Sequence, residues 1–268
     1  MWSFSDLIKN FFTHKDFLPP ADKLPGTMFT PLHFAFAALL ISVIAVAVVL
    51  VRRVGNRRLK VTFTVLWAIL LVLEITKILW ESLSGREIGF EYGGLLPLYP
   101  CSIFMYAMPL AIWGKGIVRR AGCGYVCTLG LIGGAINFIY PATVLGNYSC
   151  ISFAGFHTFI YHGVMVFTAA TMLASGYHRY TGVTRAYELL IPSMPAMAVS
   201  IVANTVNFSL GTDYMFFRCT SFIFAPIGEA LGFGSVPLMY LAYLLIHAIF
   251  YVPSYISNRV KSAKGVRF

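Results

Sequence analysis

Lysine and arginine alternate between rich and poor segments along seven hydrophobic stretches, and this alternation constrains the fold more than any other feature. The segments that follow the first, third, fifth and seventh stretches hold 14 of these cations, whereas the N-terminal segment and the other loops hold 5. Cytoplasmic loops of membrane proteins are enriched in lysine and arginine. The pattern therefore predicts an integral membrane protein with its N-terminus outside and its C-terminus in the cytoplasm.

The hydrophobic stretches have the length of membrane-spanning helices, which need roughly 20 apolar residues. They are too long and too continuously apolar for the strands of a membrane barrel. The predicted fold class is therefore all-α, a polytopic membrane protein with seven transmembrane helices. The predicted spans are Pro31–Val51, Val61–Leu83, Pro97–Gly114, Cys123–Tyr140, Phe156–Tyr177, Tyr187–Ser209 and Val236–Ile256.

These spans divide the chain into three parts. Residues 1–30 form an extracytoplasmic N-terminal segment, in which two short, partly amphipathic pieces would lie on the membrane surface. Residues 31–256 form the seven-helix transmembrane domain, and residues 257–268 form a basic cytoplasmic tail. In the fourth span, Gly130, Gly133 and Gly134 are predicted to let a neighbouring helix approach closely, as small residues do in membranes.

Composition and charge support the same class of protein. Only 11% of the residues are charged and 58% are hydrophobic, whereas soluble domains carry about 25% charged residues. The net charge of +10 does not indicate nucleic acid, because the cations lie at the ends of the spans. We expect a multi-pass protein of the cell membrane, with membrane lipid as its partner and no nucleic acid. The oligomeric state stays open.

Polar residues within the predicted spans gather at one depth, in the outer half of the membrane. Buried ionisable residues are costly in a membrane and often mark function. Glu74 and Lys77 are three residues apart on one helix face, so their charges would neutralise each other. The other members of this group are His33, Cys101, Asn137, His162, Asn204 and Asn207. Each of them alone is more often a helix-joining residue than a functional one, but the whole group favours a cavity open to the outer leaflet.

Cys101 and His162 are the candidate catalytic pair within this group. A thiol needs a base or a nearby positive charge to act as a nucleophile near neutral pH. A histidine at similar depth on another helix would serve as that base, and an asparagine or glutamate would orient it. Taken alone the pair is a weak signal, because buried cysteine usually acts as a small hydrophobic residue.

The remaining cysteines suggest less. Cys123 and Cys127 are four residues apart, where packing is the simplest interpretation and metal binding or palmitoylation the alternatives. Cys150 and Cys219 both lie in predicted outer loops, where a disulfide is open to them in an oxidising compartment. The chain has no glycine-rich phosphate loop, HExxH zinc signature or GxSxG elbow. We therefore predict no metal and no cofactor.

Three segments resemble motifs of the YwaF / transmembrane protein 164 family. They are Leu96-Pro97-Leu98-Tyr99-Pro100-Cys101-Ser102, Phe159-Ile160-Tyr161-His162-Gly163, and Asn204 to Phe217 with its Gly211-Thr212-Asp213-Tyr214-Met215-Phe216 core. Their order and spacing run through most of the chain. The chain departs from the family pattern at Tyr99, where the motif has histidine, at Pro100, where it has leucine, and at Asp213, where asparagine is usual.

The resemblance implies a function as well as a fold. The animal member is described as an acyltransferase that remodels ether phospholipids, with the motif cysteine as acyl carrier. Carried over, this makes Cys101 the nucleophile and His162 the base. The other residues of the group (His33, Glu74, Lys77, Asn137, Asn204 and Asn207) would bind the substrate, orient the histidine or stabilise the oxyanion.

Three hypotheses follow for the function. The first is a membrane enzyme of lipid metabolism, an acyltransferase or hydrolase that acts on lipid acyl groups through Cys101 and His162. The second is a transporter or channel in which Glu74, Lys77 and His247 form part of an ion or proton path. The third is a non-catalytic membrane protein whose outer cavity binds a lipid or another small molecule.

Overall fold

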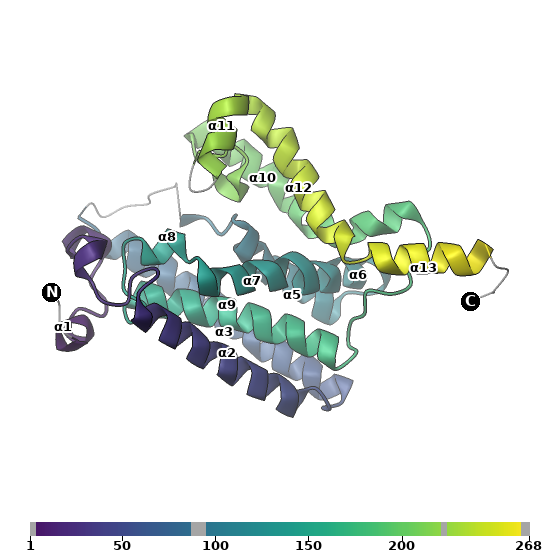
Figure 1. Ribbon diagram of the computed structural model, residues 1–268, viewed down its shortest axis with the longest axis horizontal. Coiled ribbons are helices and arrows are strands. Elements are labelled where there is room, and N and C mark those ends of the chain that lie inside the picture. The colour runs from purple at the N-terminus through teal and green to yellow at the C-terminus, as the bar shows by residue number, and fades with distance from the viewer. Residues whose placement is uncertain (1–3, 87–94, 221–223, 264–268) are drawn as a thin grey trace.

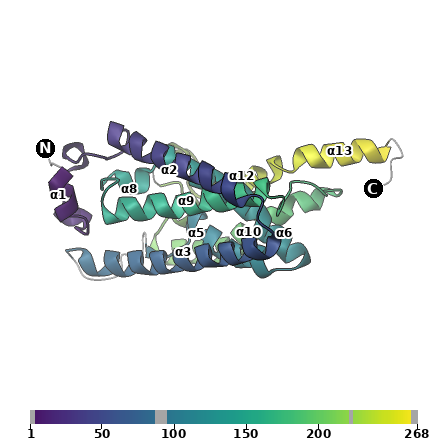
Figure 2. The same cartoon turned by 90° about the horizontal axis from the view of Figure 1, so that it is seen from below.

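The computed structural model describes residues 4–86, 95–220 and 224–263, and every regular element in these ranges is helical. The longest helices are α2 (Pro31–Val51), α3 (Asn56–Ser84) and α9 (Phe153–Ala174). They run along the long axis of the molecule (Figures 1 and 2), and α9 packs against both α2 and α3. This packing matters for the site, because α3 and α9 carry most of its ionisable residues.

A second group of helices completes the body of the molecule. α5 (Pro100–Trp113) packs against α3 on one side and α6 (Gly116–Tyr125) on the other. α6 continues through a π-helical turn, η3 (Val126–Gly130), into α7 (Leu131–Ile139), and α8 (Ala142–Leu145) follows. π-helical turns inside α-helices are rare and often occur at functional sites.

The C-terminal third consists of η4 (Ala186–Ser193), α10 (Met194–Leu210), η5 (Tyr214–Phe216), α11 (Ala225–Leu231), η7 (Gly232–Gly234), α12 (Ser235–Ile249) and α13 (Val252–Ala263). Of these, α10, α11 and α12 form a helical hairpin that leans away from α2, α3 and α9 (Figure 1). Gly211 ends α10 in the left-handed conformation, with φ of 69°, which glycine adopts without a steric penalty. The predicted seventh span is broken, because α12 ends at Ile249 and a separate helix begins at Val252.

Six helical segments in the described residues are long and apolar enough to cross a membrane. They are Pro31–Val51, Asn56–Ser84, Gly116–Leu145, Phe153–Ala174, Ala186–Leu210 and Ala225–Ile249. The chain is thus an all-helical, multi-pass membrane protein, and six of the seven predicted spans are matched. The remaining one, predicted at Pro97–Gly114, corresponds to α5, and the count of seven stays a prediction.

α5 is short for a spanning helix. Its 14 residues extend for about 21 Å at ~1.5 Å per residue, less than the ~30 Å hydrocarbon core. The helix begins at Pro100 rather than at the predicted Pro97, and proline is well suited to the first turn of a helix. Most of its side chains are buried against neighbouring helices, whereas Trp113 at its C-terminal end is 51% exposed.

Close helix contacts depend on glycine, as predicted for two of three positions. A Cβ on Gly134 would stand 3.1 Å from the His162 carbonyl oxygen, and one on Gly130 would stand 2.8 Å from the Phe104 ring. The prediction for Gly133 is wrong, because nothing lies within 4 Å of the place its Cβ would occupy. Gly133 has a different direction on the helix from its neighbour and faces no other segment.

The N-terminal segment folds over one end of the helix bundle. Its described elements are α1 (Phe4–Lys9), η1 (Lys15–Phe17) and η2 (Ala21–Lys23). The Trp80 indole N–H on α3 donates to the Phe12 carbonyl at 2.9 Å, and the Phe153 amide at the start of α9 donates to the Phe11 carbonyl at 2.8 Å. The segment is therefore held to α3 and α9, and contact with the membrane surface stays a prediction. The tail's last residues, 264–268, lie outside the described residues.

Candidate functional site

Glu74 is the centre of a buried ionic group between α3 and α9. Its side chain is only 7% exposed, and its Oε1 lies 3.7 Å from Lys77 Nζ. Its Oε2 lies 3.7 Å from Nε2 of His157, a contact too long for a hydrogen bond. The predicted pairing of Glu74 with Lys77 is thus present. The part played by His157 was missed, because sequence spacing cannot show which α9 residue faces α3.

His162 has one ring nitrogen engaged and one left with an open lone pair. Its Nδ1 lies 2.8 Å from the Thr158 carbonyl oxygen one turn earlier in α9. A carbonyl oxygen only accepts, so Nδ1 carries the proton and Nε2 is the acceptor of the neutral ring. No partner for Nε2 occurs among the described residues. A buried histidine in this tautomer is suited to take a proton from a neighbouring group.

Cys101 is the second residue of α5 and is partly buried. Its sulfur is close enough to Glu74 and Lys77 to interact with their charges, and Lys77 is also an electrostatic neighbour of His162. Within the described ranges, no hydrogen bond joins Cys101 to His162. Both candidate catalytic residues therefore lie within electrostatic range of Lys77.

Four tyrosines lie around Cys101, and none was predicted as a site residue. Tyr99, Tyr125, Tyr161 and Tyr243 each have Cys101 as an electrostatic neighbour. The Tyr125 hydroxyl donates to the Pro100 carbonyl at 2.6 Å. These tyrosines come from four different segments, and no spacing in the sequence identifies them.

His33 is held elsewhere by both of its ring nitrogens. Nδ1 accepts a hydrogen bond from the Phe29 amide at 3.1 Å, and Nε2 donates to the Phe138 carbonyl at 3.1 Å. The ring is fully buried. His33 thus joins the start of α2 to the end of α7, and no hydrogen bond or ion pair links it to Glu74 or Cys101 in the described part of the chain.

Asn207 organises the loop that follows α10. Its Oδ1 accepts from Thr212 Oγ1 at 2.9 Å and from the Tyr214 amide at 2.7 Å, and its Nδ2 donates to the Tyr214 carbonyl at 2.9 Å. The Tyr214 ring packs against Tyr99, with centroids 5.1 Å apart. Asn207 therefore supports the segment just before Cys101 indirectly, because it holds Tyr214 and the Tyr214 ring packs against Tyr99.

The other two predicted asparagines are not brought to His162 by a hydrogen bond in the described residues. Asn204 Nδ2 donates to the Tyr240 hydroxyl at 2.7 Å, which joins α10 to α12. Asn137 Oδ1 on α7 is sealed from solvent and has no hydrogen-bond partner there. Asn204 therefore joins two helices, and Asn137 has a side-chain oxygen that accepts no hydrogen bond from the described residues.

All five cysteines are free. Cys150 and Cys219 pack into two separate hydrophobic clusters, so the disulfide left open between them is not formed. Burial raises the pKa of Cys150 to about 11, which keeps it a thiol. The Sγ atoms of Cys123 and Cys127 contact the carbonyls of Ala111 and Ala169. No group of three or more potential metal ligands occurs in the described residues.

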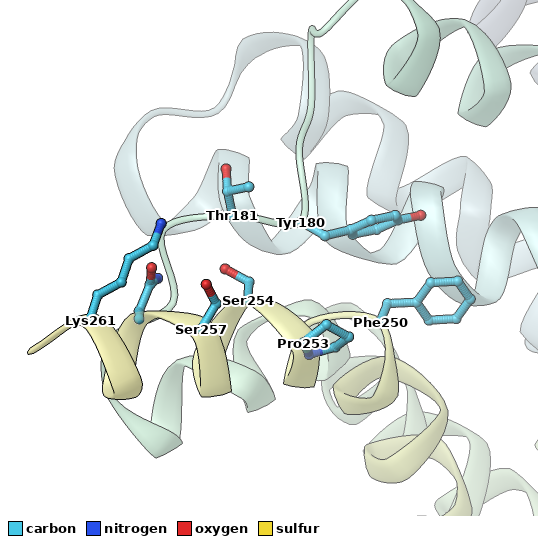
Figure 3. Close-up of a pocket in the computed structure, with 8 residues that line it drawn as sticks. Tyr180, Thr181, Phe250, Pro253, Ser254, Ser257 and Lys261 are labelled. Carbon is cyan, nitrogen blue, oxygen red and sulfur yellow. The ribbon is translucent and has the colours of Figure 1, made fainter. Parts of the chain in front are cut away.

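Two cavities of the structure lie away from this site. One of about 620 Å³ lies between α13 and the loop before η4, lined by Tyr180, Thr181, Ser254 and Lys261 among others (Figure 3). The other, of about 380 Å³, is lined by Arg218, Gly228, Glu229 and Val236 among others, near the far end of the hairpin. Neither of these two is the expected outer cavity, which stays a prediction.

Comparison with known proteins identifies the family. Searches of curated proteins and of solved structures gave no match. The family model described as the TMEM164 family matches residues 28–256, a stretch that runs from just before α2 into α13. This match includes all three motif segments and every candidate site residue. The chain belongs to the TMEM164 family.

Proposed function

We propose that the protein is a membrane enzyme that transfers or hydrolyses lipid acyl groups, with Cys101 as nucleophile and His162 as base. The observation that carries the proposal is the arrangement around Lys77. Cys101 and His162, whose Nε2 has no partner among the described residues, both lie within electrostatic range of Lys77. Lys77 pairs with the buried Glu74, and such an ion pair is unusual inside a membrane protein. Helix N-termini stabilise negative charge, and Cys101 lies in the first turn of α5.

The proposed reaction has two steps. His162 Nε2 takes the Cys101 proton, directly or through one water, and the sulfur attacks the ester carbonyl of a phospholipid. The ester C–O bond breaks, and the departing alkoxide takes the proton from His162. A lysophospholipid hydroxyl or water then attacks the thioester while His162 removes its proton. The thiolate leaves and regains a proton from His162.

Glu74 has a supporting part in this proposal. Its carboxylate contacts Lys77 through one oxygen and His157 through the other. The charges of this group can therefore offset the change in charge when a nearby residue gains or loses a proton. We further propose seven membrane crossings, with the N-terminus outside and the site in the outer half. The substrate is then a lipid of the cell membrane.

The test is acyl capture by purified protein. Wild type is incubated with phospholipid carrying a labelled acyl chain, denatured and examined for label that hydroxylamine releases, as it does from a thioester. We expect label on wild type, none on Cys101→Ala, and at least a 100-fold slower formation on His162→Ala. Cys123→Ala is the matched control, because its thiol lies in the hydrophobic core and hydrogen-bonds to a backbone carbonyl. Equal turnover by wild type and Cys101→Ala would refute the mechanism.

The buried charges also support the alternative of a proton or ion path. Glu74, Lys77 and His157 form a group of the kind found in transporters. His247, the other residue of that hypothesis, instead contacts Thr128 of the π-helical turn through Nδ1. Proton flux into liposomes that is lost in Glu74→Gln and kept in Cys101→Ala would favour this alternative. Lipid binding without turnover, retained in Cys101→Ser, would favour the non-catalytic one.

A further inference from the structure

The Tyr161 hydroxyl is a buried polar atom that lacks a hydrogen-bond partner among the described residues. The residue is only 2% exposed. Folded proteins pair nearly all of their buried polar groups, and an unpaired group often has a catalytic role or binds a molecule. Removal from water without a partner is costly, so this position gains from a ligand that offers an acceptor.

Neighbouring rings fix the position of Tyr161 on α9. Its ring stacks on His157, with centroids 5.8 Å apart and planes 30° apart, and meets His162 edge-on at 5.7 Å. The hydroxyl has both Glu74 and Cys101 as electrostatic neighbours. The Tyr161 ring therefore lies between His157, which contacts Glu74, and His162, the proposed base.

The other hydroxyls close to Cys101 are already engaged. Tyr125 donates to the Pro100 carbonyl, and Tyr243 donates to the Met215 carbonyl at 2.8 Å. Tyr99 has further interactions of its own. Of these four tyrosines, Tyr161 is the one whose hydroxyl is both sealed and unpaired.

The start of α5 supplies a second donor beside it. Amides in the first turn of a helix have no acceptor within the helix, and the backbone of Cys101 makes no hydrogen bond through its amide in the described ranges. Such amides and the helix dipole favour an anion. A negative oxygen that forms next to the Cys101 sulfur would therefore meet this amide from one side and the Tyr161 hydroxyl from the other.

We propose that Tyr161 is a catalytic residue that donates a hydrogen bond to the oxyanion formed when Cys101 attacks an acyl ester. This inference rests on the proposed function. When the Sγ–C bond forms, the carbonyl π electrons move onto oxygen, and Tyr161 stabilises that charge while keeping its proton. When the oxygen re-forms the carbonyl, the ester C–O bond breaks and the alkoxide leaves with the proton held by His162. The same hydrogen bond serves the second step.

Tyr161→Phe tests the inference, because it removes the hydroxyl and keeps the ring that packs between the two histidines. Acyl transfer is followed with labelled phospholipid in wild type, Tyr161→Phe and Tyr177→Phe. The last variant is the matched control, since the Tyr177 hydroxyl donates to Ala111 at a distance from the site. We expect kcat to fall about 10²–10³-fold in Tyr161→Phe, with KM unchanged, and to stay within about twofold in the control.

Two further measurements separate catalysis from structure. A lipid trifluoromethyl ketone, which forms a tetrahedral adduct with a thiol, should bind Tyr161→Phe about 10²–10³-fold more weakly than wild type. Alkylation of Cys101 by a neutral maleimide should proceed at the same rate in both. Slower alkylation in step with the lost activity would assign Tyr161 a structural role and overturn the inference.

The inference and the proposed function fail in different ways. If wild type transfers acyl groups through a Cys101 thioester and Tyr161→Phe does so equally fast, only the role of Tyr161 is refuted. If wild type forms no thioester and binds no ketone adduct, both are refuted.

Discussion

At the scale of single residues, hydrogen-bond partners divide His33, His157 and His162 into different roles. Both nitrogens of His33 are occupied by backbone groups, so the ring has no nitrogen left for proton transfer. His162 uses one nitrogen and keeps the other as an acceptor. His157 places Nε2 beside Glu74 without a hydrogen bond. Of these three, His162 and His157 are arranged for proton transfer, because this step needs an accessible lone pair or proton.

Asn207 gives a prediction about stability at this scale. Asn207→Ala would leave the Tyr214 amide and carbonyl and the Thr212 hydroxyl without their partner. We expect a loss of about 2–4 kcal/mol in the free energy of unfolding, because buried groups left unpaired cost more than the bond itself. Denaturant unfolding in detergent measures it. Asn204→Ala, which removes one bond to Tyr240, should cost about 1 kcal/mol. Equal losses would contradict this account.

At the scale of elements, α5 places its first turn inside the bundle. A Cβ on Gly122 of α6 would meet the Ala111 amide of α5 at 2.4 Å, so α6 approaches α5 more closely than any other residue would permit. Tyr125 then reaches the Pro100 carbonyl from α6. The start of α5 is therefore fixed by α6, and the helix also packs against α3.

The loop between α9 and η4 gives a prediction about pH. His178 Nε2 lies 2.8 Å from the Tyr251 hydroxyl, which joins this loop to the junction of α12 and α13. Burial, with smaller contributions from Arg119 and Arg120, lowers the pKa of His178 to about 4 from its ordinary 6.5. Between pH 6.5 and about 4, His178 is therefore protonated in the unfolded chain and neutral in the folded chain. The stability that depends on neutral His178 is complete above pH 6.5 and is lost as the pH falls toward 4.

We therefore expect the unfolding temperature of wild type to fall more steeply than that of His178→Gln between pH 7 and pH 5. The difference corresponds to about 2 kcal/mol at pH 5. Thermal unfolding of both proteins in detergent at several pH values is the measurement. Parallel slopes for the two would show that His178 is not the titrating group.

At the scale of the whole molecule, α1 and α13 lie at opposite ends of the long axis (Figures 1 and 2). Seven crossings and the charge alternation each predict that the two termini lie on opposite sides of the membrane. The count depends on α5, which is buried and short. If α5 crosses, the segments after α2 and after α5 lie on the same side of the membrane.

Cysteine labelling tests this topology. Arg53→Cys, Lys115→Cys and Asn147→Cys introduce thiols at exposed positions, whereas the native thiols are buried or partly buried. We expect a membrane-impermeant maleimide to label Asn147→Cys in intact cells. It should label the other two only after permeabilisation, because the lysine-rich and arginine-rich loops stay in the cytoplasm. Labelling of Arg53→Cys and Lys115→Cys from opposite sides would show that α5 does not cross.

Some of the candidate site was predictable because it depends on one helix. Glu74 and Lys77 face each other since residues three apart share a helix face. The contact of Glu74 with His157, the unpaired Tyr161 hydroxyl and the use of Asn207 by the following loop were not predictable. They depend on the rotation of α3, α9 and α10 about their own axes, and nearly uniform hydrophobicity around a membrane helix leaves that rotation undefined.

The sequence by itself determined the membrane class, the positions of six helical spans and the family, because hydropathy, charge and motifs act locally along the chain. It also predicts one depth for the polar residues, since depth follows from position within a span. Only the tertiary structure decided which of those residues meet. It placed His157 beside Glu74, took His33 and Asn207 into structural hydrogen bonds, and set the Tyr161 ring against His157 and His162. Hydrogen bonds and ion pairs require atoms within a few ångströms, and helix packing alone sets those distances.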